Sequence, residues 1–408
     1  MTAVFASTVF LSLTVAYGQT FGTVDSVYSK TLKEERKIFV YDPQSKDNMN
    51  VSVKENYPVV YLFDGEDRFS YVTLMIQQLI ENGIVPKMII VGIANTDRTR
   101  DLTPSHVDNA SYVDKTFGWN TERIKSSGGG ENFVTFIEKE LFPHIDSLYP
   151  TAPYRILIGH SFGGLTAVNI LLNHSNLFNS YIAIDPTLWW DNQKTMKQAE
   201  KDLAKKTFDG KTLFLAIANV MQPNMDTMQV RKDTTSFSMH IRSNLQFNDA
   251  LNKNKQNNLH WSSKYYKYDN HGSVPFIAEY DGLRFIFSFY KFSTPYSNEF
   301  YTFNIDSALT AHYKNVTKQM GYGILPPEGN VNNYANAFLA KKNFAKAYKL
   351  FQMNLDNYPK SFNAYNSMGD YYNETGEKQK AIEYYTKALT ISDSPDTKAK
   401  LEKLKIGK

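Results

Sequence analysis

The segment Gly159-His160-Ser161-Phe162-Gly163 places a serine between two glycines in the pattern Gly-x-Ser-x-Gly. The apolar residues 154–158 before it predict a strand, and residues 165–173 after it predict a helix. A sharp strand-to-helix turn puts the serine hydroxyl at the carboxyl edge of a sheet, where a helix terminus can stabilise an oxyanion. The pattern therefore predicts that Ser161 is a nucleophile that attacks carbonyl carbon.

A serine hydroxyl needs a nearby base, and a histidine is the usual one. His240, His260 and His271 follow the motif within the same predicted domain. His271 lies in the turn that leaves the predicted strand 264–268, so we expect it to be the base. We expect His240 to lie at a helix start on the surface and His260 at a strand entrance.

The carboxylate that orients this base should lie between Ser161 and His271 in the sequence. It usually follows the penultimate strand, here residues 212–218, which favours Asp226 and then Asp233. A serine–histidine pair without an acid is the alternative. The full set of acidic candidates is Asp185, Asp191, Glu200, Asp202, Asp209, Asp226, Asp233, Asp249 and Asp269.

An oxyanion hole requires two backbone N–H donors. We expect Phe162 to supply one, because it follows the nucleophile. The predicted strand 58–63 runs into Asp64-Gly65-Glu66, and we expect Glu66 to supply the other, with Gly65 as the alternative. A plain β-turn is the competing interpretation of this segment.

Three side chains are candidates for the substrate pocket. Trp189 and Trp190 follow the predicted strand that ends at Asp185, so we expect at least one to line the pocket. Arg98 follows the strand 87–93 at the same edge of the sheet, where it either binds an anionic substrate or pairs with an acid to hold its loop. The insertion 110–127 is a candidate lid.

Composition narrows the chemistry further. The chain has 408 residues and no cysteine, which excludes disulfides, thiolate metal sites and cysteine nucleophiles. Neither a His-Glu-x-x-His nor a P-loop pattern occurs, so we expect no metal and no cofactor. The net charge of +4 arises without a basic run, and we expect no nucleic-acid partner.

The elements around these residues alternate in type. Short β-rich runs are separated by helical stretches, which predicts an α/β domain over residues 20–305 with a mostly parallel central sheet flanked by helices. The expected strands are 37–41, 58–63, 87–93, 154–159, 181–185, 212–218 and 264–268. The expected helices are 71–81, 132–148, 165–173, 240–251 and 274–290.

The C-terminal part has a different pattern. Phe338 and Tyr372, Ala347 and Ala381, and Phe351 and Tyr385 are each 34 residues apart, the tetratricopeptide period. We therefore expect a linker at 306–330 and helical repeats at 331–408, with a protein partner as one candidate role. Because two repeats are too few for a free solenoid, we expect them to pack on the preceding domain or to gain a helix from residues 305–330.

The N-terminus resembles an export signal. Residues 4–16 carry no polar side chain larger than Ser or Thr, and Ala16-Tyr17-Gly18 offers a small-x-small cleavage site. The stretch is too short to span a bilayer, so we expect no integral membrane anchor. We expect residues 1–18 to be a signal peptide and the protein to be periplasmic or secreted.

Several motifs together resemble the putative-esterase family of α/β-hydrolases, which includes esterase D, feruloyl esterases and ferri-enterobactin (siderophore) esterases. The segments that carry the family resemblance are Val59–Gly65, Gly159–Gly164 and His271–Pro275, and those similar to the siderophore-esterase branch are Arg98–Pro104, Gly128–Gly130 and Asp185–Trp190. The resemblance implies hydrolysis of a small-molecule carboxylic ester through an acyl-enzyme, without a metal. Siderophore-type, aromatic or acyl-sugar esters are the implied substrates.

Two other functions remain open. An acyltransferase of the same fold would use the same serine and histidine but pass the acyl group to an alcohol. A hydrolase-like scaffold would instead act through the C-terminal repeats.

Overall fold

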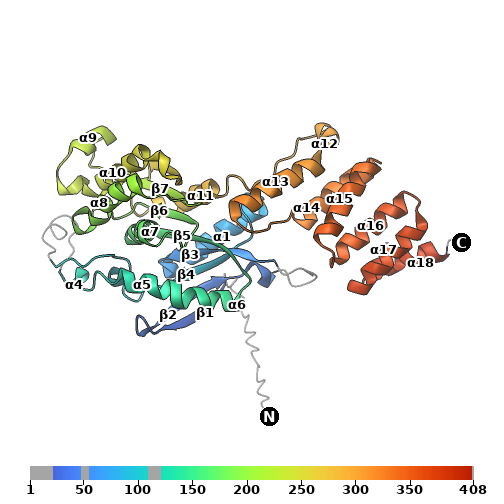
Figure 1. Ribbon diagram of the computed structural model, residues 1–408, viewed down its shortest axis with the longest axis horizontal. Coiled ribbons are helices and arrows are strands. Elements are labelled where there is room, and N and C mark those ends of the chain that lie inside the picture. Colours follow the sequence, from blue (N-terminus) through green and yellow to red (C-terminus); the bar gives the residue numbers. More distant parts are fainter. Residues whose placement is uncertain (1–21, 47–54, 109–120, 407–408) are drawn as a thin grey trace, which may run out of the picture.

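The computed structural model describes residues 22–46, 55–108 and 121–406. The expected signal peptide at 1–18 and residues 110–120 of the candidate lid lie outside the described residues. Figure 1 shows two parts, a sheet covered by helices on both faces and a stack of helices at the C-terminal end.

An eight-stranded sheet organises the first part, in the order β1-β2-β4-β3-β5-β6-β7-β8. β1 and β2 pair antiparallel, as do β2 and β4, whereas the remaining neighbours are parallel. The seven expected strands are all present, and β1 is an addition at the edge. The strands are β1 (Thr23–Ser29), β2 (Glu34–Tyr41), β3 (Tyr57–Phe63), β4 (Ile89–Ile93), β5 (Thr151–His160), β6 (Ser180–Ile184), β7 (Thr212–Ala218) and β8 (His260–Tyr266).

Both faces of the sheet are buried. In β3, Val59, Tyr61 and Phe63 belong to one hydrophobic cluster, and the alternate residues Val60 and Leu62 belong to the other. The second face packs on α1 (Gly65–Glu81) and α11 (Val274–Ile286). The first face packs on α5 (Gly130–Phe136), a π-helical turn (Ile137–Leu141), α6 (Phe142–Leu148), α7 (Phe162–Asn173), α8 (Trp190–Lys205) and α10 (Met239–Lys253). Shorter helices are α2 (Arg98–Asp101), α4 (Thr121–Ile124), α9 (Thr227–Lys232) and α12 (Glu299–Thr302).

The expected linker at 306–330 is wrong over most of its length, and the alternative of a further helix from residues 305–330 is confirmed. Residues Ile305–Met320 form helix α13, whose buried Leu309 and Val316 give it an apolar face that must be covered. Coil therefore occupies only residues 321–327. The following helices are α14 (Glu328–Ala340), α15 (Phe344–Asn357), α16 (Phe362–Glu374), α17 (Lys378–Ile391) and α18 (Pro395–Ile406).

The 34-residue period corresponds to two stacked helical hairpins. α14 packs on α15 and α16 on α17, and Figure 1 shows them side by side toward the C-terminus. Residues at the same place in each repeat, such as Phe351 and Tyr385, are buried. Gly369 lets the second hairpin close, because a Cβ there would lie 2.5 Å from the Tyr385 ring.

The repeats are joined to the sheet domain by a shared core, as their unpaired faces predict. Leu309 of α13, Val331 of α14 and Ile80 at the end of α1 line one cavity of about 460 Å³. His312 also places its Nε2 2.9 Å from the carbonyl oxygen of Tyr290. The described part of the chain holds no helix both long and apolar enough to cross a membrane.

Candidate active site

Ser161 lies in the sharp turn between β5 and α7, with φ 60° and ψ −115°. A non-glycine residue with positive φ is strained, and the turn is possible because the residues two positions away on each side are glycines. A Cβ at Gly159 would lie 2.2 Å from the carbonyl oxygen of Gly163. The Ser161 hydroxyl lies 3.2 Å from Thr187 Oγ1. The backbone therefore has the form that the motif predicts.

His271 lies just beyond β8, and its partner is Asp185. The His271 Nδ1 atom is 2.6 Å from Asp185 Oδ2. Asp185 follows β6 and is fully buried, whereas the His271 side chain is 39% exposed. The structure thus brings a histidine and a carboxylate together near the end of the strand that carries Ser161.

The expectation that Asp226 orients the histidine is wrong, and so is the second choice, Asp233. The Asp226 carboxylate accepts hydrogen bonds from the N–H groups of Met228 and Gln229 and caps α9. Asp233 accepts from the N–H and hydroxyl of Thr235.

The carboxylate instead comes from one strand earlier. Asp185 follows β6, and its Oδ1 accepts a hydrogen bond of 3.1 Å from the N–H of Ala218 at the end of β7. The side chain thus reaches across to the neighbouring strand end. The available sequence signal was an aspartate that follows the apolar residues Ile182, Ala183 and Ile184 and precedes Pro186.

Four donors surround the Asp185 carboxylate. Oδ1 also accepts from Asn244 Nδ2 at 3.1 Å, and Oδ2 accepts from His240 Nε2 at 2.8 Å as well as from His271. Burial acts to raise the pKa of Asp185, but the charges and hydrogen bonds of His240 and His271 outweigh it and hold the pKa well below its usual range. The group is therefore an anion throughout the neutral range.

His240 is buried rather than a surface cap, contrary to expectation. Trp189 Nε1 lies 2.9 Å from His240 Nδ1. An indole nitrogen can only donate, so Nδ1 accepts and Nε2 carries the proton that is given to Asp185. His240 is therefore held in one orientation, with Nδ1 as the acceptor and Nε2 as the donor.

Asp185, His240 and His271 also form a group with ligand atoms within 4.8 Å of one another, the spacing of a possible metal site. Here Asp185 Oδ2 already accepts hydrogen bonds from both imidazoles, and His240 Nδ1 accepts one from Trp189 Nε1. A metal ion would have to displace these hydrogen bonds. The donor set fits a hydrogen-bonded histidine pair on one carboxylate better than a cation site.

The expectation that Trp189 or Trp190 lines a pocket is wrong, since they are 2% and 1% exposed. Trp190 donates its ring N–H to the carbonyl oxygen of Ser105 and packs edge-on against Phe162, with ring centroids 5.1 Å apart. Large aromatic side chains gain most by burial where the ring N–H finds an acceptor. The two tryptophans support the site from the core.

The turn between β3 and α1 packs tightly against β4. Asp64 has a positive φ of 57°, and a Cβ at Gly65 would lie 2.5 Å from the carbonyl carbon of Gly92. Gly65 and Glu66 are the first two residues of α1, whose first-turn N–H groups have no acceptor within the helix. The Glu66 carboxylate accepts from the N–H of Asn95 at 3.1 Å.

Arg98 connects this turn to the nucleophile's loop. Its guanidinium makes two hydrogen bonds to the Asp64 carboxylate, at 2.7 and 3.0 Å, and one of 3.2 Å to the carbonyl oxygen of His160. Of the two roles expected for Arg98, the structure shows an ion pair that holds its loop, at the wall of a cavity.

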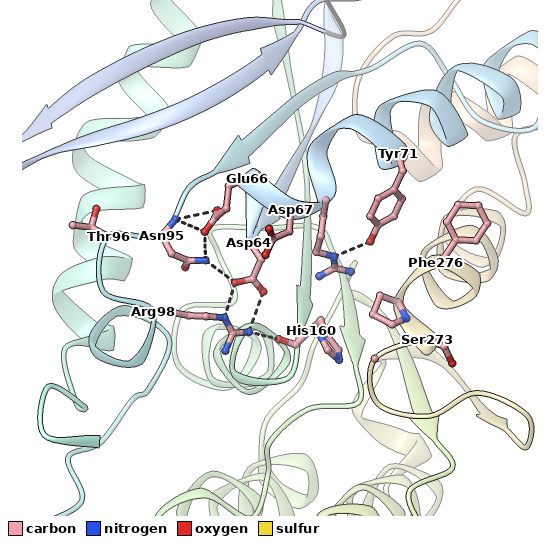
Figure 2. Close-up of a pocket in the computed structure, with 13 residues that line it drawn as sticks. Asp64, Glu66, Asp67, Tyr71, Asn95, Thr96, Arg98, His160, Ser273 and Phe276 are labelled. Atoms are coloured by element: carbon pink, nitrogen blue, oxygen red, sulfur yellow. Dashed lines mark hydrogen bonds and ion pairs between the residues drawn. The ribbon is translucent and has the colours of Figure 1, made fainter. Parts of the chain in front are cut away.

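A cavity of about 610 Å³ is lined in part by His160, the residue that precedes Ser161 (Figure 2). It is bounded by α1 on one side and by the loop after His271 on the other. Its lining residues are Asp64, Glu66, Asp67, Arg68, Tyr71, Asn95, Thr96, Arg98, His160, Gly272, Ser273, Pro275 and Phe276.

Comparison with known proteins gives two family matches. Residues 29–272, more than half of the chain, match the family described as "Putative esterase". Residues 330–394 match the tetratricopeptide repeat.

Curated relatives and solved structures agree with the first match. The chain is 28% identical over 194 residues to the ferri-bacillibactin esterase BesA of Bacillus subtilis, covering 42% of this chain and 63% of that protein. It is 30% identical over 156 residues to a siderophore enterobactin esterase of Emericella nidulans, covering 35% of this chain and 50% of that protein. The chain thus spans less than two thirds of these relatives' lengths.

Among solved structures, an IroE-like serine hydrolase from Shewanella oneidensis is 30% identical with a TM-score of 0.69, over 82% of this chain and 99% of that one. An uncharacterised protein from Capnocytophaga ochracea, 18% identical with a TM-score of 0.59, shares the fold over 94% of this chain and 99% of that one.

Proposed function

Because the chain belongs to the putative-esterase family, we propose that it hydrolyses carboxylic esters through an acyl-enzyme formed on Ser161. The observation that carries the proposal is the 2.6 Å contact between His271 and buried Asp185 near the strained turn that holds Ser161. An anionic carboxylate, a histidine and a serine on such a turn form the set of groups that serine hydrolases use.

In the proposed reaction His271 is the base. Its Nδ1–H donates to Asp185, which leaves Nε2 to accept the Ser161 proton. Ser161 turns from Thr187 toward His271 when an ester binds, since catalytic hydrogen bonds often tighten only with substrate. Ser161 then attacks the carbonyl carbon, His271 gives the proton to the leaving alcohol, and water hydrolyses the acyl-enzyme by the same steps.

The oxyanion is proposed to accept hydrogen bonds from two backbone N–H groups. Phe162 is the first residue of α7 and supplies one. Glu66, or Gly65 beside it, supplies the other from the first turn of α1. Donors at two helix N-termini are fixed before the reaction and favour the negative charge that develops on the carbonyl oxygen.

For the substrate we propose an ester of the siderophore type. The relatives named as ferri-bacillibactin and enterobactin esterases support this class. Aromatic and acyl-sugar esters are the other classes to compare. A panel of siderophore lactones, feruloyl esters, acetylated sugars and simple nitrophenyl esters will rank them by kcat/KM.

Replacing the nucleophile tests the mechanism. Ser161→Ala should reduce ester cleavage by ~10³-fold or more and abolish labelling by a fluorophosphonate probe, with little change in stability. Thr187→Val, which keeps the Ser161 hydroxyl, is the matched control and should still be labelled. Near-normal turnover by Ser161→Ala would refute the proposal. Added alcohols would yield new esters if the enzyme transfers acyl groups.

The repeats favour a second, compatible role in binding a protein partner, supported by their match to the tetratricopeptide family. For location we propose the periplasm or the exterior, supported by the apolar residues 4–16 and the small residues that follow. N-terminal sequencing of the mature protein tests the location, and a start at or close to Gln19 is expected. A mature chain that retains Met1–Gly18 would contradict it.

A further inference from the structure

The cavity beside Ser161 contains a buried arginine with an unused donor. Arg68, on α1, is 5% exposed and lines the cavity. Its Nε donates to the hydroxyl of Tyr71 at 3.1 Å, and its Nη2 donates to Glu279 of α11. Its Nη1 has no hydrogen-bond partner among the described residues. Glu279 Oε2 is likewise buried without a partner, so the pair joins one nitrogen to one oxygen and leaves Nη1 unbonded. A buried charged donor without a partner is costly, which favours a further acceptor there.

A second polar atom without a partner borders the same cavity. His160 Nε2 is buried and has no hydrogen bond within the described residues. Burial, then the charges of His271 and Arg68, lowers the pKa of His160 to about 3, so the ring is neutral and can carry a proton on Nε2. The His160 and His271 ring centroids are 4.4 Å apart. His160 therefore lies close to the base.

The other charges at the cavity are already paired or face solvent. Arg98 is bonded to Asp64, and the Glu66 carboxylate accepts from Asn95. Asp67 is exposed. Figure 2 shows Arg98 turned toward Asp64, with Tyr71 and Phe276 at the opposite side of the cavity. Among the buried side-chain atoms of the described lining residues, Arg68 Nη1 and His160 Nε2 are those without a hydrogen-bond partner.

Glu279, the carboxylate paired with Arg68, is only partly ionised near neutral pH. Burial raises the pKa of Glu279 to about 7, against the opposing influence of Arg68 and Tyr71. At and below that pH much of Glu279 carries a proton, and Arg68 is then a buried cation without a full anionic partner.

We propose that Arg68 Nη1 and His160 Nε2 bind a carboxylate that the ester substrate itself carries. The two oxygens of one carboxylate can accept one hydrogen bond from each of these two residues. Hydrogen bonds to an ionised acceptor are about twice as strong as those between neutral groups. The inference rests on the proposed esterase function but not on the siderophore class. The enzyme would then prefer monoesters of dicarboxylic acids over uncharged esters of the same size.

The test compares matched substrates. Chromogenic phenyl monoesters of succinic, glutaric and adipic acid are paired with isosteres in which isopropyl replaces the carboxylate, and the Ser161→Ala rate is subtracted as background. We expect kcat/KM to favour the charged ester at one chain length or more by on the order of 10-fold or more. The corresponding free dicarboxylates should inhibit competitively.

Variants assign the preference to Arg68. The double variant Arg68→Met with Glu279→Met replaces a buried ion pair by apolar groups, which is often tolerated, and should bring the ratio of charged to uncharged ester close to one. Arg68→Lys, which keeps the charge but loses the fork of donors, should lower the ratio. The control double variant Arg231→Met with Asp249→Met removes an exposed ion pair. It should leave the ratio of charged to uncharged ester cleavage unchanged.

The outcomes separate the two proposals. Cleavage of uncharged esters without any preference in the native protein overturns the carboxylate site and leaves the esterase function intact. A preference that survives in the double variant overturns the assignment to Arg68. Failure to cleave any ester, siderophore lactones included, overturns the esterase function itself.

Discussion

Asp185 and Asp226 offer a matched pair of substitutions at the residue scale. Asp185→Asn should lower kcat by on the order of 10²–10⁴, because the amide no longer favours the tautomer of His271 that can accept the Ser161 proton. Asp226→Asn should leave kcat almost unchanged and cost at most ~1 kcal/mol through a weaker cap on α9. Steady-state kinetics and thermal melting measure both. The opposite ranking would return the role to Asp226.

The two histidines on Asp185 should behave differently although they share one oxygen. His271→Ala should lower kcat by ~10³-fold or more because the base is lost. His240→Phe should cost about 1–3 kcal/mol of stability, because Trp189 Nε1 loses its buried acceptor, and should lower kcat by less than ~10-fold. Urea unfolding and kinetics compare the two variants. Comparable catalytic losses would make His240 part of the reacting set.

The sequence was informative about residues fixed by local backbone geometry. Ser161 follows from its glycines, and His271 from its place after the last strand. Asp185 was not chosen because the acid usually follows the penultimate strand, here β7, whereas Asp185 follows β6. Its carboxylate nevertheless reaches the end of β7, where it accepts a hydrogen bond from the N–H of Ala218. The prediction that Trp189 or Trp190 lines the pocket was wrong because both are buried by contacts distant in sequence. Trp189 contacts His240 of α10, and Trp190 contacts Ser105.

At the scale of elements, α1 and α11 are joined by the buried pair of Arg68 and Glu279. The pKa of Glu279 is raised from its ordinary 4.5 to about 7, so its contribution to stability is complete below pH 4.5 and is lost as pH rises through 7. The free energy of unfolding should fall by on the order of 3 kcal/mol across this range through this group.

Urea unfolding at pH 5 and pH 7.5 measures this dependence. Glu279→Gln should flatten it, whereas Glu383→Gln on the exposed side of α17 should retain the native slope. An unchanged slope in Glu279→Gln would show that the ion pair keeps Glu279 ionised throughout.

Elements were predicted well where the hydrophobic period was strong. The central parallel strands appear as nearly unbroken apolar runs, and all seven expected strands are present. The helix α13 was expected only as an alternative to a linker, because Gly321, Gly329 and two prolines made the segment resemble a linker. Its helical character comes from packing of its apolar face, a tertiary contact that local sequence signals do not report.

At the scale of the whole molecule, the tail should stabilise the protein without taking part in catalysis. A chain that ends at Phe303 should still cleave small esters, because Ser161, His271 and Asp185 all precede it. Its melting temperature should fall by roughly 5–10 °C, since removing α13 exposes the apolar surface around Ile80. Loss of cleavage in a folded product would place the tail in the active site, and unchanged stability would make the tail an independent arm.

The shared core around α13 also decides how a partner on the repeats would meet the ester site. A long flexible linker lowers the effective concentration of a bound partner at the active site, because the partner samples a large volume. Here Lys346 of α15 donates hydrogen bonds to the carbonyl oxygens of Tyr301 and Phe303, which precede α13. The repeats are therefore bonded to the segment that connects them to the sheet domain. A partner bound to the repeats would therefore be held at one distance and in one orientation relative to the cavity.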